Sequence, residues 1–350
     1  MEEYKYIYTP LPEPIPITEQ VWPEGTLPLV HTRTLAYMHE NYIRDCIEGI
    51  LMQRTTFPVL VLIHDDASTD KTAEIIREYE QRYPHLIKAH YQKENSHTKP
   101  DRYEHRTEFH SWETGKYVAF CDSDDYWTDP LKLQKQVDFL EANPDYGLVY
   151  TRTRYYIQEQ NKFQGHLGAY CDTFESLLLR NVIPTLTVVA RKDLYDEYFH
   201  EIKPNNQKWL LGDWPGWLWF AKRSKIRYEN YVTSVYRELP ESMSRSDDQE
   251  KMERLARSRT SIAEYFIDRY GGEEGNTPQD VFLLKTWLLF KYACLADSRR
   301  HLFDKIRMDI DKIQTRPLSL RLLYMKSVLF YRPMRHLFVT YIKIQRIIRR

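Results

Sequence analysis

The first half of the chain twice repeats one arrangement, in which a short apolar run ends in an acidic turn. Residues 59–63 lead into an acidic turn at 64–70 and then a helical pattern at 72–79, and residues 117–120 lead into a second acidic turn at 121–127. Apolar runs that alternate with helical periodicity predict a parallel α/β sheet. Ligands of such sheets bind beyond the carboxyl ends of the strands, so we expect both acidic turns to face one crevice.

The second acidic turn carries three carboxylates within four residues, at Asp122, Asp124 and Asp125. Like charges this close are tolerated when they are solvated, protonated or neutralised by a cation. Oxygen ligands suit a hard divalent ion, and Mg²⁺ is commonly held by one or two carboxylates together with substrate phosphates. Taken alone, the turn fits equally well as a solvated Asp-rich turn that caps the next helix. The matching turn upstream favours the metal site.

Three separated motifs resemble those of the family 2 inverting glycosyltransferases, which have the GT-A fold and act in bacterial surface polysaccharide synthesis. They are Tyr-Met-His-Glu at 37–40, His-Asp-Asp-Ala-Ser-Thr-Asp at 64–70 and Asp-Ser-Asp-Asp-Tyr-Trp at 122–127. The resemblance covers about residues 28–245. It implies a Rossmann-like α/β fold with a mostly parallel sheet flanked by helices. It also implies transfer of a sugar, with inversion, from a nucleotide-sugar (we expect a UDP-sugar) to an acceptor hydroxyl on a glycan or a lipid-linked glycan.

The same resemblance implies roles for individual residues. Contacts with the donor nucleotide are implied for Ala36, Tyr37, Glu40, Asp65 and Asp66. Asp122 would face the ribose or the metal-linked waters, Asp124 would bind Mn²⁺ or Mg²⁺, and Asp125 is a third candidate for either role.

A segment that closes over the diphosphate is implied at residues 236–244, with Arg237 and Ser242 as donor contacts. Two positions depart from the family pattern. Met38 stands where the family commonly has Asn, and Leu239 stands where many members have a His that can bind the metal. The second departure predicts a thinner metal shell.

Asp213 stands at the head of an aromatic segment, Trp-Pro-Gly-Trp-Leu-Trp at 214–219. The residues alone favour a helix N-cap, because an Asp before Pro215 is a common capping arrangement. A carboxylate against Trp faces is also desolvated, which raises its pKa toward the range of a general base. The resemblance implies the second role, in which Asp213 deprotonates the acceptor hydroxyl for a direct displacement.

The length and composition of the chain limit its domain organisation and the classes of protein to which it can belong. The 350 residues predict an extended arm at 1–27, a glycosyltransferase domain at 28–245 and a helical extension at 246–350. Equal numbers of basic and acidic residues, 50 each, give no global field that favours nucleic acid. Four widely spaced cysteines predict neither a zinc site nor a disulfide framework. No signal peptide or membrane-spanning run is recognisable, and we expect a cytoplasmic protein.

Within the glycosyltransferase domain the pattern predicts individual elements. Strands are expected at 29–35, 59–63, 87–91, 117–121, 147–154 and 185–189, and helices at 42–52, 72–82, 106–114, 131–141, 174–180 and 209–222.

The C-terminal tail has a strong positive charge bias. Residues 313–350 contain nine Lys or Arg and no Asp or Glu. The last segment, 337–350, resembles a basic amphipathic helix suited to an anionic membrane surface, such as the inner face of the cell membrane. An ordinary terminal helix docked on the catalytic domain with a solvated basic face fits the pattern equally well.

Two rival functions remain open at this level. The departures at Met38 and Leu239 are compatible with a degenerate module that binds a nucleotide or glycan without turnover. A nucleotidyltransferase also uses metal-binding carboxylates, although no Gly-rich phosphate loop with a basic residue follows the first predicted strand.

Overall fold

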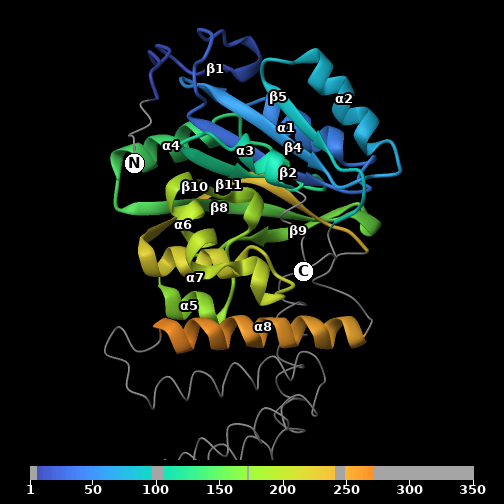
Figure 1. Ribbon diagram of the computed structural model, residues 1–350, viewed down its shortest axis with the longest axis vertical. Helices are drawn as coiled ribbons and strands as arrows, with labels where there is room; N and C mark the ends of the chain where they lie inside the picture. The colour runs from blue at the N-terminus through green and yellow to red at the C-terminus, as the bar shows by residue number, and fades with distance from the viewer. Residues whose placement is uncertain (1–5, 97–105, 172, 241–248, 271–350) are drawn as a thin grey trace, which may run out of the picture. The chain divides into compact units, whose positions relative to one another are not determined.

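The computed structural model describes residues 6–96, 106–171, 173–240 and 249–270 (Figure 1). The chain divides into two compact units. The first, here the sheet unit, comprises Met1–Gln207 and Gly216–Glu238, and the second comprises Lys208–Pro215 and Leu239–Arg350. The predicted boundary at residue 245 and the predicted basic helix at 337–350 lie outside the described residues.

The second unit contains the helix α8 (Gln249–Tyr270). The indole of Trp209 packs on the rings of Tyr265 and Phe266, and the main-chain N–H of Leu210 donates to Ser258 Oγ at 2.8 Å. Within the part of the chain that the structure describes, no helix has both the length and the apolar character needed to span a bilayer.

The remaining described elements follow one another along the chain. The strands are β1 (Ile15–Pro16), β2 (Val30–Ala36), β3 (Arg54–Thr55), β4 (Val59–Asp65), β5 (Ile87–Tyr91), β6 (Tyr117–Phe120), β7 (Tyr126–Trp127), β8 (Tyr146–Ile157), β9 (Lys162–Leu167), β10 (Val189–Arg191) and β11 (Lys225–Glu238). The α-helices are α1 (Ile43–Leu51), α2 (Thr72–Arg82), α3 (Thr107–Ser111), α4 (Lys132–Ala142), α5 (Phe174–Leu179), α6 (Lys192–Ile202) and α7 (Trp214–Arg223). Short 3₁₀ helices occupy Ile17–Glu19, Gln158–Gln160, Thr185–Thr187 and Pro204–Gln207.

The sheet unit is built on a nine-stranded mixed sheet in the order β5-β4-β2-β6-β10-β8-β11-β7, with β9 paired to β8 (Figure 1). Strands β5, β4, β2 and β6 run parallel, and so do β8 and β11. Strand β10 is antiparallel to both of its neighbours, β6 and β8. This order and the run of four parallel strands confirm the predicted α/β class, with β2 inside a Rossmann-like half-sheet.

Side-chain alternation along β6 explains how the sheet is covered. Tyr117, Ala119 and Cys121 belong to a buried core that includes apolar residues of α1, α2 and α4. Phe120 points to the opposite face, because successive side chains alternate along a strand, and its ring meets Tyr195 of α6 and Trp217 of α7. Every side chain of β6 is therefore buried, which is why the strand reads as a continuous apolar run.

Helix α1 approaches the backbone of β7 very closely. A Cβ atom at Gly49 would lie 2.8 Å from both the main-chain N and O of Trp127. Glycine at this position therefore allows α1 to pack directly against the strand that follows the acidic turn. The neighbouring residue Cys46 is a free thiol whose Sγ lies 3.7 Å from that of Cys121.

Most of the predicted strands and helices are confirmed, and two predictions are wrong in part. The strand expected at 185–189 begins only at Val189. Residues Thr185–Thr187 form a 3₁₀ turn instead, in which the main-chain N–H of Thr187 donates to Pro184 O at 3.0 Å. The helix expected from residue 209 begins at Trp214, which places Pro215 in the first turn, where its missing N–H costs nothing.

Two residues beside the acidic turns adopt the left-handed conformation although neither is glycine. Met38 has φ 58° and Ala67 has φ 62°. This conformation destabilises an L-residue by about 1–2 kcal/mol, whereas glycine adopts it without steric strain. Met38 and Ala67 lie in the loops that end β2 and β4, and such strain commonly accompanies function.

Replacing Ala67 with glycine should therefore stabilise the protein by about 1 kcal/mol, which raises the thermal midpoint by roughly 2–4 °C. Thermal unfolding followed by circular dichroism measures the shift. Ala73→Gly is the matched control, because Ala73 lies in α2, where the same exchange should destabilise by about 1 kcal/mol. A lower midpoint for Ala67→Gly would contradict the strain at this position.

Candidate active site

The carboxyl ends of four parallel strands meet at one edge of the sheet, at Ala36, Asp65, Tyr91 and Phe120. The loops that follow are tied to the neighbouring strands. The main-chain N–H of Asp66 donates to Ala36 O at 2.9 Å, that of Gln92 to Asp65 O at 2.8 Å, and that of Ser123 to Leu35 O at 3.3 Å. The two acidic turns predicted from the sequence thus lie at the same edge of the sheet.

Side chains join these loops directly. A ring nitrogen of His39, Nδ1, lies 2.6 Å from Ser123 Oγ, which links the loop after β2 to the acidic turn after β6. The main-chain N–H of Met38 donates to Ser68 Oγ at 2.9 Å, which links the same loop to the turn after β4. His39 and Ser123 were not assigned a role from the sequence, and their contact fixes the relative position of the predicted donor-binding and metal-binding turns.

Asp66 is buried and surrounded by donors. Its Oδ1 accepts from the main-chain N–H of Ser96 at 2.9 Å and from Ser96 Oγ at 2.8 Å, and Arg106 Nη2 lies 3.7 Å from Oδ2. Burial alone would raise the pKa of Asp66, but contacts with His64 and Ser96 and the charge of Arg106 outweigh it and hold the pKa below its usual range. The Asp66 carboxylate is therefore ionised and held in one position by these contacts.

Asp65 differs from its neighbour although both are buried. Its Oδ2 accepts from the main-chain N–H of Ser68 at 3.1 Å, whereas Oδ1 has no hydrogen-bond partner among the described residues. Burial raises the pKa of Asp65, and the bonds from Ser68 offset this only in part. A buried acceptor without a protein donor is costly, so Asp65 has capacity to accept from a ligand.

The other predicted nucleotide contacts lie around the loop after β2. Ala36 is the last residue of β2 and is buried, whereas Tyr37 is 46% exposed. Glu40 Oε2 accepts from the main-chain N–H of Lys71 at 2.9 Å, and the N–H of Glu40 donates to Asp70 Oδ2 at 3.1 Å. These reciprocal bonds hold the loop against the start of α2 and leave the phenol ring of Tyr37 exposed beside it.

The three carboxylates after β6 have different surroundings. Asp122 and Asp124 are half-buried, while Asp125 is 3% exposed. Asp125 Oδ1 accepts from the main-chain N–H of Arg237 at 2.8 Å, which joins the acidic turn to β11. Burial and the adjacent Asp124 raise the pKa of Asp125 well above its usual range. Asp125 therefore anchors the turn, and its role as a metal ligand stays a prediction.

Within the described ranges, no three or more His, Cys, Asp or Glu side chains cluster so as to hold a metal by themselves. Asp122 and Asp124 nevertheless offer accessible oxygen donors at the sheet edge. Mg²⁺ usually keeps several waters and takes one or two carboxylates plus substrate phosphates. The donor set present fits a cation that is shared with a diphosphate and does not fit a closed protein cage.

Arg237 lies in β11, near its end, and is 6% exposed. Its Nη1 donates to the main-chain O of Asp124 at 2.8 Å and its Nη2 to Asp45 Oδ2 at 2.6 Å. The guanidinium lies between the rings of Tyr42 and Tyr126, with its central carbon 4.8 and 5.1 Å from their centroids. The predicted closing segment thus begins inside a strand, and Ser242 lies outside the described residues.

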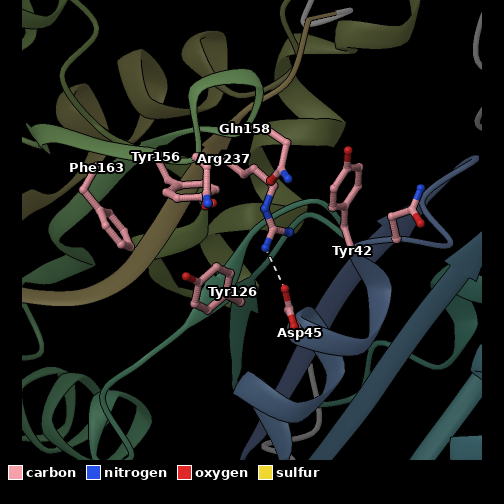
Figure 2. Close-up of a pocket in the computed structure, with 9 residues that line it drawn as sticks. Tyr42, Asp45, Tyr126, Tyr156, Gln158, Phe163 and Arg237 are labelled. Atoms are coloured by element: carbon pink, nitrogen blue, oxygen red, sulfur yellow. Dashed lines mark hydrogen bonds and ion pairs between the residues drawn. The ribbon is translucent and has the colours of Figure 1, made fainter.

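A cavity of about 720 Å³ opens beside Arg237 (Figure 2). Its walls come from the start of α1, from β7, from the end of β11 and from the β8–β9 hairpin. Asp45, Tyr42 and the hairpin residues were not predicted from the sequence as site residues. In the sequence, Asp45 stands out only as an acidic residue in the first turn of α1. Tyr126, which also lines the cavity, stands out only as part of the Tyr-Trp pair after the acidic turn.

Asp213, the predicted base, immediately precedes α7 and is half-buried. It belongs to the Lys208–Pro215 segment of the second unit. Asp213 therefore stands at the N-cap position of α7, and both its capping role and its catalytic role stay predictions.

Lys132, in the first turn of α4, is fully buried behind the acidic turn. Its Nζ lies 4.3 Å from the centre of the Trp127 ring and has no hydrogen-bond partner among the described residues. Burial lowers the pKa of Lys132 from 10.5 to about 7. The unfolded chain therefore binds a proton that the folded protein does not, and folding stability should rise with pH between about 7 and 10.5.

Replacing Lys132 with methionine should remove this dependence and raise stability at pH 7. The expected gain is on the order of a few kcal/mol, since each pKa unit corresponds to about 1.4 kcal/mol and the Trp127 ring offsets part of the cost. Urea midpoints of both proteins at pH 7, 8 and 9 give the result. Equal pH slopes for the two proteins would show that Lys132 titrates normally.

Comparison with known proteins identifies similar sequences and a matching protein family. The model of "Glycosyl transferase family 2" matches residues 34–199. The putative teichuronic acid biosynthesis glycosyltransferase TuaG of Bacillus subtilis is 35% identical over 221 residues, which cover 62% of this chain and 82% of TuaG. The Escherichia coli protein WfaP, named as a UDP-Glc:alpha-D-GlcNAc-diphosphoundecaprenol beta-1,3-glucosyltransferase, is 26% identical over 212 residues, 60% of this chain and 77% of WfaP.

Some sequence matches cover less of the related proteins. Uncharacterized proteins of Mycobacterium tuberculosis and Mycobacterium bovis are 37% identical over 175 residues, and the chain spans 49% of their length. Among solved structures, S. aureus TarS 1-349 in complex with UDP-GlcNAc aligns over 90% of this chain and 91% of that chain, with 17% identity and a TM-score of 0.48.

Proposed function

The chain belongs to glycosyl transferase family 2, and from that membership we propose that it transfers a sugar from a nucleotide-sugar donor to an acceptor hydroxyl. One observation carries the proposal. The acidic turn after β6 and the turn that contains Asp65 and Asp66 lie at one edge of a parallel sheet and are joined through the loop after β2. This edge is where ligands of open α/β sheets bind.

The donor would lie across this edge. The base and ribose would be bound by the loops that contain Tyr37, Glu40, Asp65 and Asp66, since Asp65 offers an unsatisfied acceptor and Tyr37 an exposed ring. The diphosphate would lie near Asp122 and Asp124, which would hold Mn²⁺ or Mg²⁺ between them and the phosphate oxygens. A divalent cation bound there supplies Lewis-acid stabilisation of the charge that develops on the leaving diphosphate.

Asp213 would accept the proton of the acceptor hydroxyl as its oxygen attacks the anomeric carbon. Attack on the face opposite the leaving nucleotide inverts the anomeric configuration and needs no covalent intermediate. A carboxylate positioned in this way contributes typically about 10²–10⁴-fold to the rate.

The names of two relatives support an acceptor class. TuaG is named for teichuronic acid biosynthesis, and WfaP is named for a UDP-glucose donor and a diphosphoundecaprenol-linked acceptor. We therefore propose a UDP-sugar donor, a lipid-linked glycan acceptor and a role in surface polysaccharide assembly. In this proposal the protein acts at the inner face of the membrane, and the basic segment 337–350 contacts anionic lipid.

The donor can be identified without knowledge of the acceptor. Ligands that bind the native state raise its thermal midpoint, so UDP-, GDP- and dTDP-sugars are compared by thermal shift with Mn²⁺ and with EDTA. We expect a UDP-sugar to give the largest shift, and only with the metal present. If no nucleotide-sugar in the panel shifts the midpoint, the proposed function fails.

A further inference from the structure

The cavity beside Arg237 has two facing aromatic sides. Figure 2 shows Phe163 and Tyr156 on one side and Tyr42 on the other, with Arg237 between them and Tyr126 below. Side-chain amides of Asn41, Gln158 and Asn161 complete the lining. A volume of about 720 Å³ lies within the range of roughly 300–1,000 Å³ that is typical of small-molecule sites.

Contacts within the β8–β9 hairpin hold the aromatic side in place. The rings of Tyr156 and Phe163 are 4.9 Å apart, and the guanidinium of Arg154 lies 3.6 Å from the centre of the Phe163 ring. The Tyr156 hydroxyl donates to Asn161 Oδ1, and Asn161 adopts the left-handed conformation that this residue tolerates well. Phe163 is therefore a positioned ring that remains 39% exposed.

The two charged residues that line the cavity pair with each other. Its lining contains one carboxylate, Asp45, and one guanidinium, Arg237, and these two groups form an ion pair with an Nη2–Oδ2 distance of 2.6 Å. An anionic ligand such as a nucleoside diphosphate would have to compete with Asp45 for a guanidinium that is already paired. Flat aromatic faces with planar amides and a paired charge suit a neutral ligand that has an apolar ring face and many hydroxyl groups.

We propose that this cavity binds the saccharide end of the acceptor. The inference rests on the proposed glycosyl transfer and names the place of its second substrate. Of the implied donor contacts, Arg237 lines the cavity, where it is paired with Asp45, whereas Ala36, Tyr37, Glu40, Asp65 and Asp66 do not line it. Arg237 nevertheless bonds to the main-chain O of Asp124 and, through its own N–H, to Asp125, so the cavity wall is continuous with the turn assigned to the donor diphosphate.

The test measures saccharide binding directly and needs no turnover. Saturation-transfer NMR is recorded on the full chain with UDP and diamagnetic Mg²⁺, against a panel of neutral saccharides: glucose, galactose, rhamnose, N-acetylglucosamine and N,N′-diacetylchitobiose. Phe163→Ala should weaken the bound saccharide about 3- to 10-fold, the value of one aromatic stacking contact, and leave UDP binding unchanged. Because Phe163 is partly exposed at a hairpin, the variant should keep its fold.

Tyr170→Ala is the matched control, since Tyr170 is 70% exposed on the same unit and does not line the cavity. It should bind saccharide and UDP as the wild type does. Absence of saccharide binding by the wild type, equal binding by Phe163→Ala, or a loss of UDP affinity in that variant would each overturn the proposal. A different result would contradict the proposed glycosyl transfer alone. In that case the saccharide would bind in a way that depends on Phe163, but no nucleotide-sugar would be consumed.

Discussion

Asp124→Ala is expected to abolish the metal dependence of donor binding. In the wild type, affinity for a UDP-sugar should fall at least about 10-fold when EDTA removes Mn²⁺, a difference of about 1.4 kcal/mol. The variant should bind with the weaker affinity in both conditions, because the carboxylate that shares the cation with the diphosphate is gone. Calorimetric titration of the nucleotide with Mn²⁺ and with EDTA gives both affinities.

Asp196→Ala controls for the loss of a carboxylate in general. Asp196 lies in α6, its side chain is 60% exposed, and it pairs with Lys192. Exposed ion pairs contribute little to stability, so this variant should keep the wild-type metal dependence. Equal donor affinity with and without metal in the wild type would remove the basis for a cation at Asp122 and Asp124.

Asp213→Asn is expected to lower sugar transfer by at least about 100-fold and to leave donor affinity intact. The exchange separates the two roles that the sequence allows. Asparagine caps a helix as well as aspartate does, so α7 should keep its N-terminus, but a neutral amide cannot accept the acceptor proton. Initial rates at saturating donor, together with donor titration, measure the two effects.

Asp213→Ala completes the comparison, since alanine removes both the cap and the carboxylate and should cost about 1 kcal/mol of stability in addition. If Asp213→Asn transfers sugar at the wild-type rate while Asp213→Ala is destabilised, Asp213 is a helix cap and another group is the base.

Local patterns in the sequence were enough to predict the half-sheet that carries the donor turns. Residues 59–63 and 117–120 are apolar because both faces of these strands are covered, and an Asp-rich turn follows each run. The periodicity of α2 and α4 reflects one buried face each. Such features depend on neighbours in the chain, so they are visible without the fold.

The parts that depend on distant pairing were not visible in this way. Strand β11 was not predicted, although it is 14 residues long, pairs in parallel with β8 and brings Arg237 to the acidic turn. Its pairing with β8 contains three register shifts, which interrupt the regular side-chain alternation that marks a strand in a sequence. Asp45 and Phe163 line one cavity only because the hairpin, α1 and β11 meet there.

Glycosyl transfer is tested most directly by measuring both of its products in one reaction. The full chain is incubated with the UDP-sugar chosen by thermal shift, Mn²⁺ and a lipid-linked saccharide, and the products are quantified by mass spectrometry. We predict that UDP and a new glycoside form in equal amounts. Binding of the UDP-sugar without its consumption would identify a binding module, and release of UMP or pyrophosphate would identify other chemistry; either result would contradict the proposed glycosyl transfer.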